Sequence, residues 1–257
     1  MSKLSVVLAT FNEEKNLGRC LDSVKDIASE IIVVDGTSKD KTVEIARKYG
    51  AKVHVTTNPP IFHINKQKAI DRASGDWILQ LDADEVVSEE LGREIIEKIS
   101  GKAFENGFWM PRKNYFLGRF LMKGGQYPDY TVRLYKNGKG KLPQKDVHEQ
   151  AVIEGKVGYL HGALLHYPYK NFAAYRMKWM RYNHLLAAQL KEELKGRSFA
   201  TKIIYALGYL IAKPGHWMVT SYGRHKGFMD GWQGFVFALF SALRFPVSYY
   251  LYISGKV

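Results

Sequence analysis

Two aspartates that follow a short apolar run are the residues best suited to chemistry in this sequence. Asp82 and Asp84 directly follow Leu79–Leu81 and are separated by one residue. If the strand continues, their side chains point the same way, because strand side chains alternate between two faces. Mg²⁺ is usually held by one or two carboxylates together with substrate phosphates. The pair therefore predicts a divalent cation and a phosphate-bearing substrate, although the same spacing also occurs in turns and helix caps.

The elements that must position these aspartates alternate between strand and helix. Strands predicted at 4–9, 31–35, 52–55 and 77–81 alternate with helices predicted at 16–24, 41–49 and 64–73. This pattern is typical of an α/β fold whose parallel sheet is covered on both faces. Ligands of such sheets bind beyond the carboxyl ends of the strands. The polar residues expected at that edge are Thr10, Asn12, Glu13, Asp35, Asp82 and Asp84.

The segments at these strand ends resemble those of the family 2 glycosyltransferases. The resemblance rests on Ala9–Glu14, Val33–Thr42 and Leu81–Glu85. A closer similarity, to a subgroup typified by lipopolysaccharide-core β-1,4-glucosyltransferases, rests on Asn114–Arg119, Gly124–Asp129, Val147–Glu149 and Gly227–Phe235. Together these segments extend over nearly the whole chain. The resemblance implies a GT-A fold, Rossmann-like with a mostly parallel sheet and helices on both faces, and an inverting sugar transfer, with glucose as the expected sugar.

The resemblance also implies a donor site for a UDP-sugar with Mg²⁺ or Mn²⁺. Asp84 is the preferred metal ligand, while Asp82 is assigned to the ribose or to a metal-bound water. Asp35 would contact the uracil or ribose, although it could equally cap the following helix. The remaining donor-binding candidates are Thr10, Asn12, Glu13, Lys68 and Arg133; Lys68 is preferred to Lys66 because it matches a Gln-Lys pair of the family.

Transfer with inversion needs a general base for the acceptor hydroxyl. Asp129 and Glu149 are the two candidates, and Asp129 is preferred because it follows a loop-like run, Gly124–Pro128, that could place a carboxylate beside the donor site. The Glu-Asp pair common in the family is absent from this sequence. Arg133 could orient Asp129 or bind a donor phosphate. His148 or His166 could complete the metal site, since imidazole is a suitable ligand, but either could be structural.

The formal net charge of +13 points to an anionic partner. An anionic membrane surface or a glycolipid acceptor is the favoured explanation. Aromatic residues among the basic ones could serve single-stranded nucleic acid. No nucleic-acid motif accompanies them, so we expect no nucleic-acid partner.

The last third of the chain changes character. A helix is predicted at 172–194, and an apolar one at 199–212 that ends at Lys213–Gly215, where Pro214 marks a break. A third apolar segment, 232–253, is interrupted by Arg244 and Pro246. These pieces fit interfacial helices better than spanning ones, while a helical subdomain or dimer interface is the alternative. We therefore predict a catalytic domain at 1–170 and a helical region for membrane association or oligomerisation at 171–257.

The single cysteine, Cys20, excludes an intramolecular disulfide framework and is expected to be buried. No signal segment precedes the first strand, so we expect the protein in the cytoplasm, peripheral on the inner membrane face. Two other classes are alternatives: a dinucleotide oxidoreductase, which would need a Gly-x-Gly-x-x-Gly turn absent here, and a non-catalytic membrane-binding protein that keeps the fold. A protein or another polymer could also be the acceptor.

Overall fold

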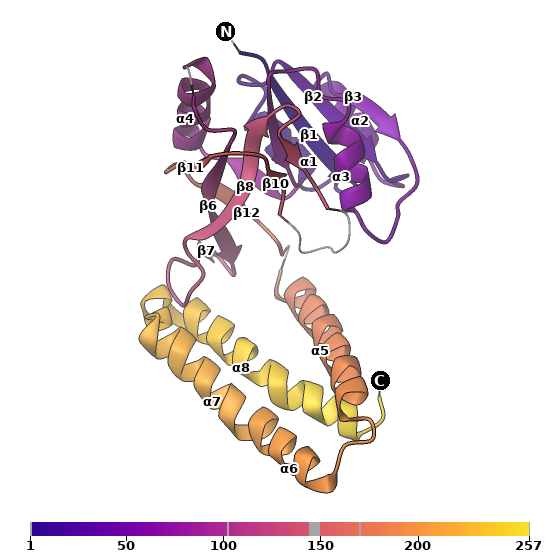
Figure 1. The fold of residues 1–257 in the computed structure, drawn as a ribbon, viewed down its shortest axis with the longest axis vertical. Coiled ribbons are helices and arrows are strands. Elements are labelled where there is room, and N and C mark those ends of the chain that lie inside the picture. Colours follow the sequence, from indigo (N-terminus) through magenta and orange to yellow (C-terminus); the bar gives the residue numbers. More distant parts are fainter. Residues whose placement is uncertain (1, 102, 144–149, 170, 257) are drawn as a thin grey trace. The chain divides into compact units, whose positions relative to one another are not determined.

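The chain folds into two compact units in the computed structural model (Figure 1). The structure describes residues 2–101, 103–143, 150–169 and 171–256. One unit comprises residues 1–113 with 129–166, and it contains most of the sheet. The other, a helical unit, comprises residues 114–128 with 167–257.

Parallel strands form one side of the sheet, in the order β3-β2-β1-β4. The strands are β1 (Leu4–Thr10), β2 (Glu30–Asp35), β3 (Lys52–Val55) and β4 (Trp77–Leu81). The helices that connect them are α1 (Leu17–Asp22), α2 (Thr42–Lys48) and α3 (His63–Ile70). The predicted alternation of strands and helices is confirmed. The segments of β1, β2 and β4 each form one buried strand, whereas β3, at the edge of the sheet, is largely exposed.

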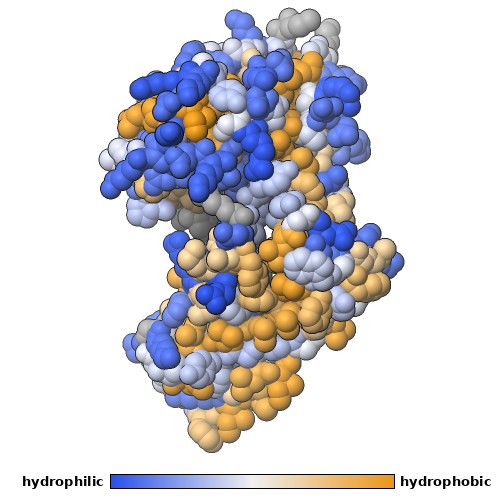
Figure 2. Space-filling view, turned by 180° about the vertical axis from the view of Figure 1, so that it is seen from behind, coloured by the Kyte–Doolittle hydropathy of each residue, from blue (hydrophilic) through white to orange (hydrophobic). Residues whose placement is uncertain are grey.

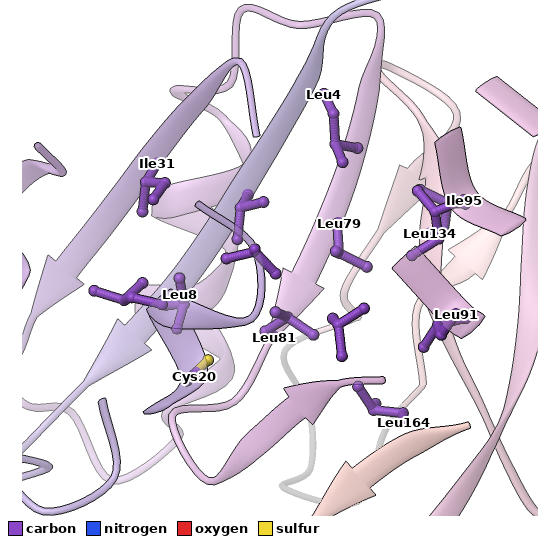
Figure 3. Close-up of a cluster of buried hydrophobic side chains, with 14 of the residues drawn as sticks. Leu4, Leu8, Cys20, Ile31, Leu79, Leu81, Leu91, Ile95, Leu134 and Leu164 are labelled. Carbon is purple, nitrogen blue, oxygen red and sulfur yellow. The ribbon is translucent and has the colours of Figure 1, made fainter. Parts of the chain in front are cut away.

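Alternate residues of these strands face two separate clusters, so helices cover both faces. Leu8 and Leu79 belong to the larger cluster, together with Cys20 of α1 and Leu91 (Figure 3). Ile78 points to the opposite face and packs in the cluster that contains Ala69 of α3. Burying each large apolar side chain contributes about 1.5–3 kcal/mol. Burial on both faces explains why β1, β2 and β4 are near-continuous apolar runs.

The other side of the sheet is largely antiparallel and continues the order as β8-β6-β12-β5. Its elements are β5 (Glu85–Val87), α4 (Glu89–Ser100), β6 (Gly107–Phe116), β7 (Arg119–Phe120), β8 (Asp129–Lys136), β11 (Val157–Tyr159) and β12 (Leu164–His166). A small hairpin is formed by β9 (Gly140–Lys141) and β10 (Val152–Ile153).

Strand pairing brings the site residues to one edge. In the β1–β2 pair Thr10 lies opposite Asp35. Since β8 runs antiparallel to β4, with Trp77 opposite Lys136, the beginning of β8 lies beside the end of β4. Asp129, the first residue of β8, is therefore carried toward the edge at which Asp82 follows β4.

The helical unit contains α5 (Phe172–Leu194), α6 (Phe199–Leu207), η1 (Gly208–Ala212), α7 (Lys213–Trp217), η2 (Met218–Arg224), η3 (Gly227–Asp230) and α8 (Gly231–Ile253). The predicted break at Lys213–Gly215 is wrong, because helical residues follow one another without interruption from Phe199 to Arg224. Pro214 stands in the first turn of α7, directly after the π-helical segment η1. Proline has no backbone N–H to donate. After the wider turns of a π-helix, an N–H at this position would not have its usual α-helical acceptor, so its absence removes no regular α-helical hydrogen bond.

Arg244 and Pro246 interrupt the apolar sequence of the last segment but do not end the helix, because α8 runs through both residues. Arg244 stacks on aromatic rings, with its guanidinium carbon 4.6 Å from the Trp217 ring centre. Within the described residues, one helix, Gly227–Ile253, is long and apolar enough to cross a membrane, judged by length and composition.

Candidate active site

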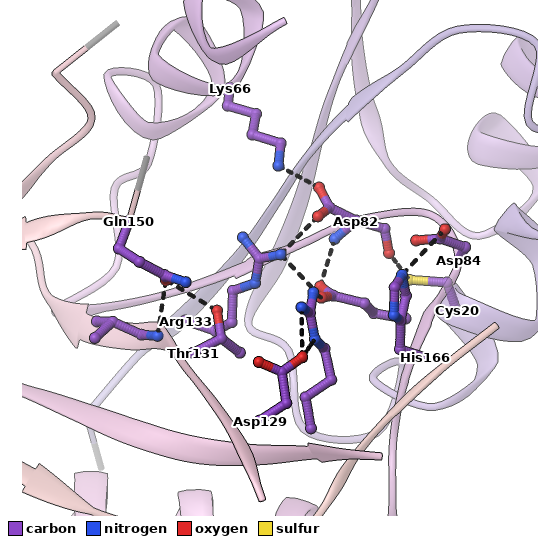
Figure 4. Close-up of polar contacts among 12 residues, drawn as sticks. Cys20, Lys66, Asp82, Asp84, Asp129, Thr131, Arg133, Gln150 and His166 are labelled. Atoms are coloured by element: carbon purple, nitrogen blue, oxygen red, sulfur yellow. Dashed lines mark hydrogen bonds and ion pairs between the residues drawn. The ribbon is translucent and has the colours of Figure 1, made fainter. Parts of the chain in front are cut away.

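The turn after β4 sets the directions of the two motif aspartates. β4 ends at Leu81, and the backbone then turns, with the N–H of Glu85 bonded to the carbonyl of Asp82 at 2.9 Å. The Glu85 carboxylate in return accepts the Asp82 N–H at 2.9 Å. Because the strand stops here, the alternation expected of a continuing strand does not apply. Asp82 points toward Lys66 and Arg133, while Asp84 points toward His166 (Figure 4).

Two buried cations hold Asp82. Lys66 of α3 forms an ion pair with Asp82 Oδ1, and Arg133 Nη2 of β8 lies 2.6 Å from Asp82 Oδ2. Burial opposes ionisation, but Arg133 and Lys66 outweigh it and keep the pKa of Asp82 well below its usual range. The Asp82 side chain is still 30% exposed. It is therefore a charged group at the surface of the site, fixed in place by two partners.

A second carboxylate, Glu85, extends this ion-pair network. Glu85 is fully buried; its Oε1 lies 2.9 Å from Arg133 Nη2 and 3.4 Å from Arg112 Nη1. Arg112 Nη2 in turn lies 2.7 Å from Asp129 Oδ2, and its Nε donates to the same oxygen at 3.0 Å. The predicted base Asp129 is thus held by Arg112, and Arg133 contacts Asp82 and Glu85. Sequence reasoning missed both Glu85 and Arg112.

Replacing Glu85 should destabilise the protein strongly. Glu85→Ala leaves the buried Arg133 and the half-buried Arg112 without one of their carboxylate partners, and breaking a buried ion pair costs about 3–5 kcal/mol. We expect urea denaturation to show a drop of this size in the free energy of unfolding.

Glu154→Ala is the matched control, because the Lys139–Glu154 pair, 3.1 Å apart, is largely exposed. Such surface pairs contribute about 0–1 kcal/mol. Equal losses in the two variants would contradict a stabilising role of the Glu85 contacts.

Asp84 and His166 are two predicted metal ligands that the structure places together. His166 Nε2 of β12 lies 3.4 Å from Asp84 Oδ2. No group of three or more His, Cys, Asp or Glu side chains among the described residues is placed to hold a metal ion. A carboxylate and an imidazole nevertheless fit a divalent cation whose other ligands are phosphate oxygens and water. His148 lies outside the described residues.

The loops after β1 and β2 form the other side of the candidate site. Thr10 Oγ1 donates to Asp35 Oδ1 at 3.0 Å, and Ser38 donates to Asp35 through its N–H (2.8 Å) and its hydroxyl (2.6 Å). Asp35 is fully buried, so its carboxylate organises this loop. It does not cap the following helix as the alternative predicted, because α2 begins after Lys41 without a side-chain cap. Asn12 and Thr37 have left-handed φ angles of 57° and 63°. Strain of this kind in non-glycine residues costs about 1–3 kcal/mol and clusters at functional sites.

Further contacts in these loops hold the remaining donor-site candidates. The Asn12 N–H donates to Ser38 Oγ at 2.8 Å, and the Glu13 N–H donates to Thr42 Oγ1 at 2.7 Å. Lys68, preferred from the sequence, donates to Thr56 Oγ1 and Asn65 Oδ1, both at 3.2 Å. The structure thus brings Lys66, and not Lys68, to the Asp82 carboxylate.

Two further predictions concern single residues near this edge. Cys20 is buried as expected; burial raises the pKa of its thiol, and Sγ lies 3.5 Å from the Asp82 carbonyl oxygen. Glu149, the alternative base, lies outside the described residues. Gln150, which follows it, accepts hydrogen bonds from the Thr131 hydroxyl (3.0 Å) and the Val132 N–H (3.2 Å) of β8.

Comparison with known proteins identifies the family. Residues 5–155 match the family model for glycosyl transferase family 2. The chain belongs to this family. Its similarity to the Rhizobium meliloti lipopolysaccharide core biosynthesis glycosyltransferase LpsC is 31% identity over 94% of this chain and 91% of LpsC. An uncharacterized glycosyltransferase of Rickettsia typhi, RT0209, is 28% identical over 92% of this chain and 82% of the relative.

Solved structures share the fold of this family 2 glycosyltransferase. S. aureus TarS aligns with a TM-score of 0.51 over 85% of this chain and 48% of TarS, at 18% identity. TarS 1-349 in complex with UDP aligns with a TM-score of 0.50 over 98% of this chain and 92% of that chain, at 15% identity. These similarities confirm the GT-A fold predicted from the sequence.

Proposed function

We propose that this family 2 glycosyltransferase moves a sugar, in our prediction glucose, from a UDP-sugar to a glycolipid such as lipopolysaccharide core. One observation carries the proposal. The Asp82–Glu85 turn is linked through the buried Arg133 and the half-buried Arg112 to Asp129 at the carboxyl ends of the parallel strands. This arrangement supplies an anchored acidic motif and a second oriented carboxylate, which are the two parts that an inverting transfer needs.

The donor half of the proposal rests on the loops after β1 and β2. These loops and the strand ends before them carry four of the donor-site candidates, Thr10, Asn12, Glu13 and Asp35. The left-handed backbone of Asn12 supports a binding role, because backbone strain clusters at functional sites. Similarity of fold to TarS, which was solved with UDP, is compatible with a uridine nucleotide. In the proposal Asp35 positions the loop that contacts the nucleotide. Lys68 is the residue proposed to bind a donor phosphate.

Asp84 and His166 would hold the divalent cation, Mg²⁺ or Mn²⁺. When bound, the cation would neutralise negative charge on the diphosphate leaving group. Asp82, already paired with Lys66 and Arg133, would contact the ribose or a metal-bound water. Arg133 then acts by positioning Asp82 and Glu85, so its proposed contribution to donor binding is indirect.

Asp129 would act as the general base. Arg112 binds Oδ2 through both Nε and Nη2, which holds this carboxylate oxygen in place. Asp129 takes the proton of the acceptor hydroxyl while the oxygen of that hydroxyl forms a bond to the anomeric carbon. The bond from that carbon to the UDP oxygen breaks on the opposite side, and UDP leaves with the electron pair. Attack from the opposite face inverts the anomeric centre.

We propose that the enzyme works at the cytoplasmic face of the membrane, with residues 1–170 for catalysis and 171–257 for membrane association. Similarity to LpsC, named for lipopolysaccharide core biosynthesis, supports a glycolipid acceptor. Of the net charge of +13, the unit made of 114–128 and 167–257 carries +12, from 15 Lys and Arg against 3 Asp and Glu. Such a charge favours anionic lipid surfaces.

Calorimetric titration with UDP and UDP-glucose, with and without Mg²⁺ or Mn²⁺, tests the donor assignment. We expect binding of UDP that depends on the metal, and no comparable binding of GDP, CMP or NAD. If the folded protein bound none of these nucleotides, the transfer mechanism would be wrong and a non-catalytic membrane-binding role would be supported instead. Tight NAD binding alone would point to an oxidoreductase.

A further inference from the structure

The helical stretch from Phe199 to Arg224, comprising α6, η1, α7 and η2, has an unusual surface. One side packs against α8, where Tyr209 is buried 5.8 Å (ring centre to ring centre) from Phe245. The other side exposes large apolar side chains at helical spacing. Six of them are between 49% and 79% exposed: Phe199, Ile204, Leu207, Leu210, Ile211 and Val219. None of the residues of α6 is buried.

Three of these residues share one side of the helix. Ile204, Leu207 and Ile211 are three and four residues apart, which places them on the same side of a helix. Figure 2 shows hydrophobic residues gathered over the part of the molecule where Figure 1 places α6 to α8. Monomeric soluble proteins rarely expose contiguous apolar patches of this kind, which usually mark an interaction site. We call this side of residues 199–224 the apolar face.

The charged residues around the apolar face indicate which kind of partner binds it. No acidic residue occurs between Glu193 and Asp230, whereas six basic residues do: Lys195, Arg197, Lys202, Lys213, Arg224 and Lys226. The unit that contains this helix has a net charge of +12, whereas the unit of 1–113 and 129–166 has +1, from 23 Lys and Arg against 22 Asp and Glu. Nearly all of the positive charge therefore accompanies the exposed apolar surface.

A second copy of this chain is a poor occupant, because it would bring one strongly positive unit against another, and like charges oppose association. An anionic membrane surface complements both properties of this unit. Its negative headgroups attract the basic residues, and the boundary between headgroups and acyl chains can bury the apolar residues. Aromatic residues in the unit, Trp217 and Trp232, are 39% and 59% exposed and suit the headgroup level.

We propose that residues 199–224 lie in the plane of an anionic membrane, with the apolar face buried at the boundary between headgroups and acyl chains. This inference rests on the proposed membrane location but not on the identity of the donor. It assigns lipid contact to a particular helix and leaves α8, although long and apolar, packed against α5 and α7. Binding at such a surface combines apolar burial with electrostatic attraction, so it should require anionic lipid and weaken with salt.

Co-sedimentation of the full chain with vesicles tests the proposal. Wild-type protein should bind vesicles of equal parts phosphatidylcholine and phosphatidylglycerol, and bind pure phosphatidylcholine much more weakly. The double variant Ile204→Gln/Ile211→Gln should lower the partition coefficient about tenfold or more, because it removes apolar area without changing charge. Lys202→Gln/Lys213→Gln should reduce the preference for anionic lipid, by roughly fivefold for each charge.

The matched control is Phe104→Gln/Val152→Gln, two exposed apolar residues of the other unit, which should bind like the wild type. Equal binding of the Ile204→Gln/Ile211→Gln variant and the wild type would overturn the proposal. So would a dimeric wild type that becomes monomeric in this variant while vesicle binding stays the same. UDP titration of the same samples separates the two proposals. Loss of vesicle binding with unchanged UDP binding would not affect the proposed donor site. Loss of UDP binding with unchanged vesicle binding would not affect the proposed membrane helix.

Discussion

Asp84→Asn is expected to lower kcat/KM for UDP-sugar transfer by about 10²–10⁴-fold. The substitution keeps the shape of the side chain but removes the charge that, with His166 3.4 Å away, would hold the divalent cation. Metal ions contribute several kcal/mol of charge stabilisation in such reactions, and each 1.36 kcal/mol corresponds to a factor of about ten. The measurement is the rate of UDP release at several Mg²⁺ or Mn²⁺ concentrations, together with calorimetric UDP binding.

Asp26→Asn is the matched control, because it makes the same change of charge at an exposed position. Asp26 precedes β2 and so lies toward the opposite edge of the sheet. It should retain wild-type kinetics and metal-dependent UDP binding. If Asp84→Asn also retained both, Asp84 would not be a metal ligand, and His166→Ala would then show whether the cation is held elsewhere.

Asp129→Asn is expected to lower kcat by about 10²–10⁴-fold, the usual contribution of a general base. Metal-dependent UDP binding should persist, because the proposed donor contacts come from other residues. The measurement is kcat for UDP release from UDP-glucose with a truncated lipopolysaccharide as acceptor. Thermal unfolding should accompany it, because the substitution weakens the contacts of Asp129 with Arg112.

Glu149→Gln, measured in parallel, decides between the two base candidates. Glu154→Gln serves as a control for the loss of a surface carboxylate in the same part of the chain. A large loss of kcat in Glu149→Gln, with Asp129→Asn within about threefold of the wild type, would assign the base to Glu149. In that case Arg112 and Asp129 would form a structural ion pair.

The parallel half of the fold is predictable from the sequence because its signals are local. Runs such as 31–35 are apolar and β-branched, each ends in turn-forming residues, and the following segment has helical spacing. Chain direction alone then brings Thr10, Asp35 and Asp82 to one edge. The motif aspartates of the site are therefore identifiable from the sequence by itself.

The partners of those acids were decided only by tertiary structure. Arg133 is 51 residues from Asp82, and Arg112 is 27 residues from Glu85, so no local spacing predicts either contact. Both depend on β8 entering the sheet antiparallel beside β4, which is a long-range pairing. The same is true of Lys66, which reaches Asp82 because α3 covers that face of the sheet, while the sequence favoured Lys68.

The C-terminal helices show the same division. Composition alone indicated a basic, aromatic and apolar region, since those properties are sums over residues. The helix that continues past Pro214 was not predictable in this way. A proline breaks a helix only where its missing N–H and its ring cannot be accommodated, and Pro214 follows a π-helical segment. Which apolar side chains pack on α8 and which remain exposed also depends on packing between helices far apart in the sequence. Tertiary structure, and not composition, therefore determined that Tyr209 lies in the core and Ile211 at the surface.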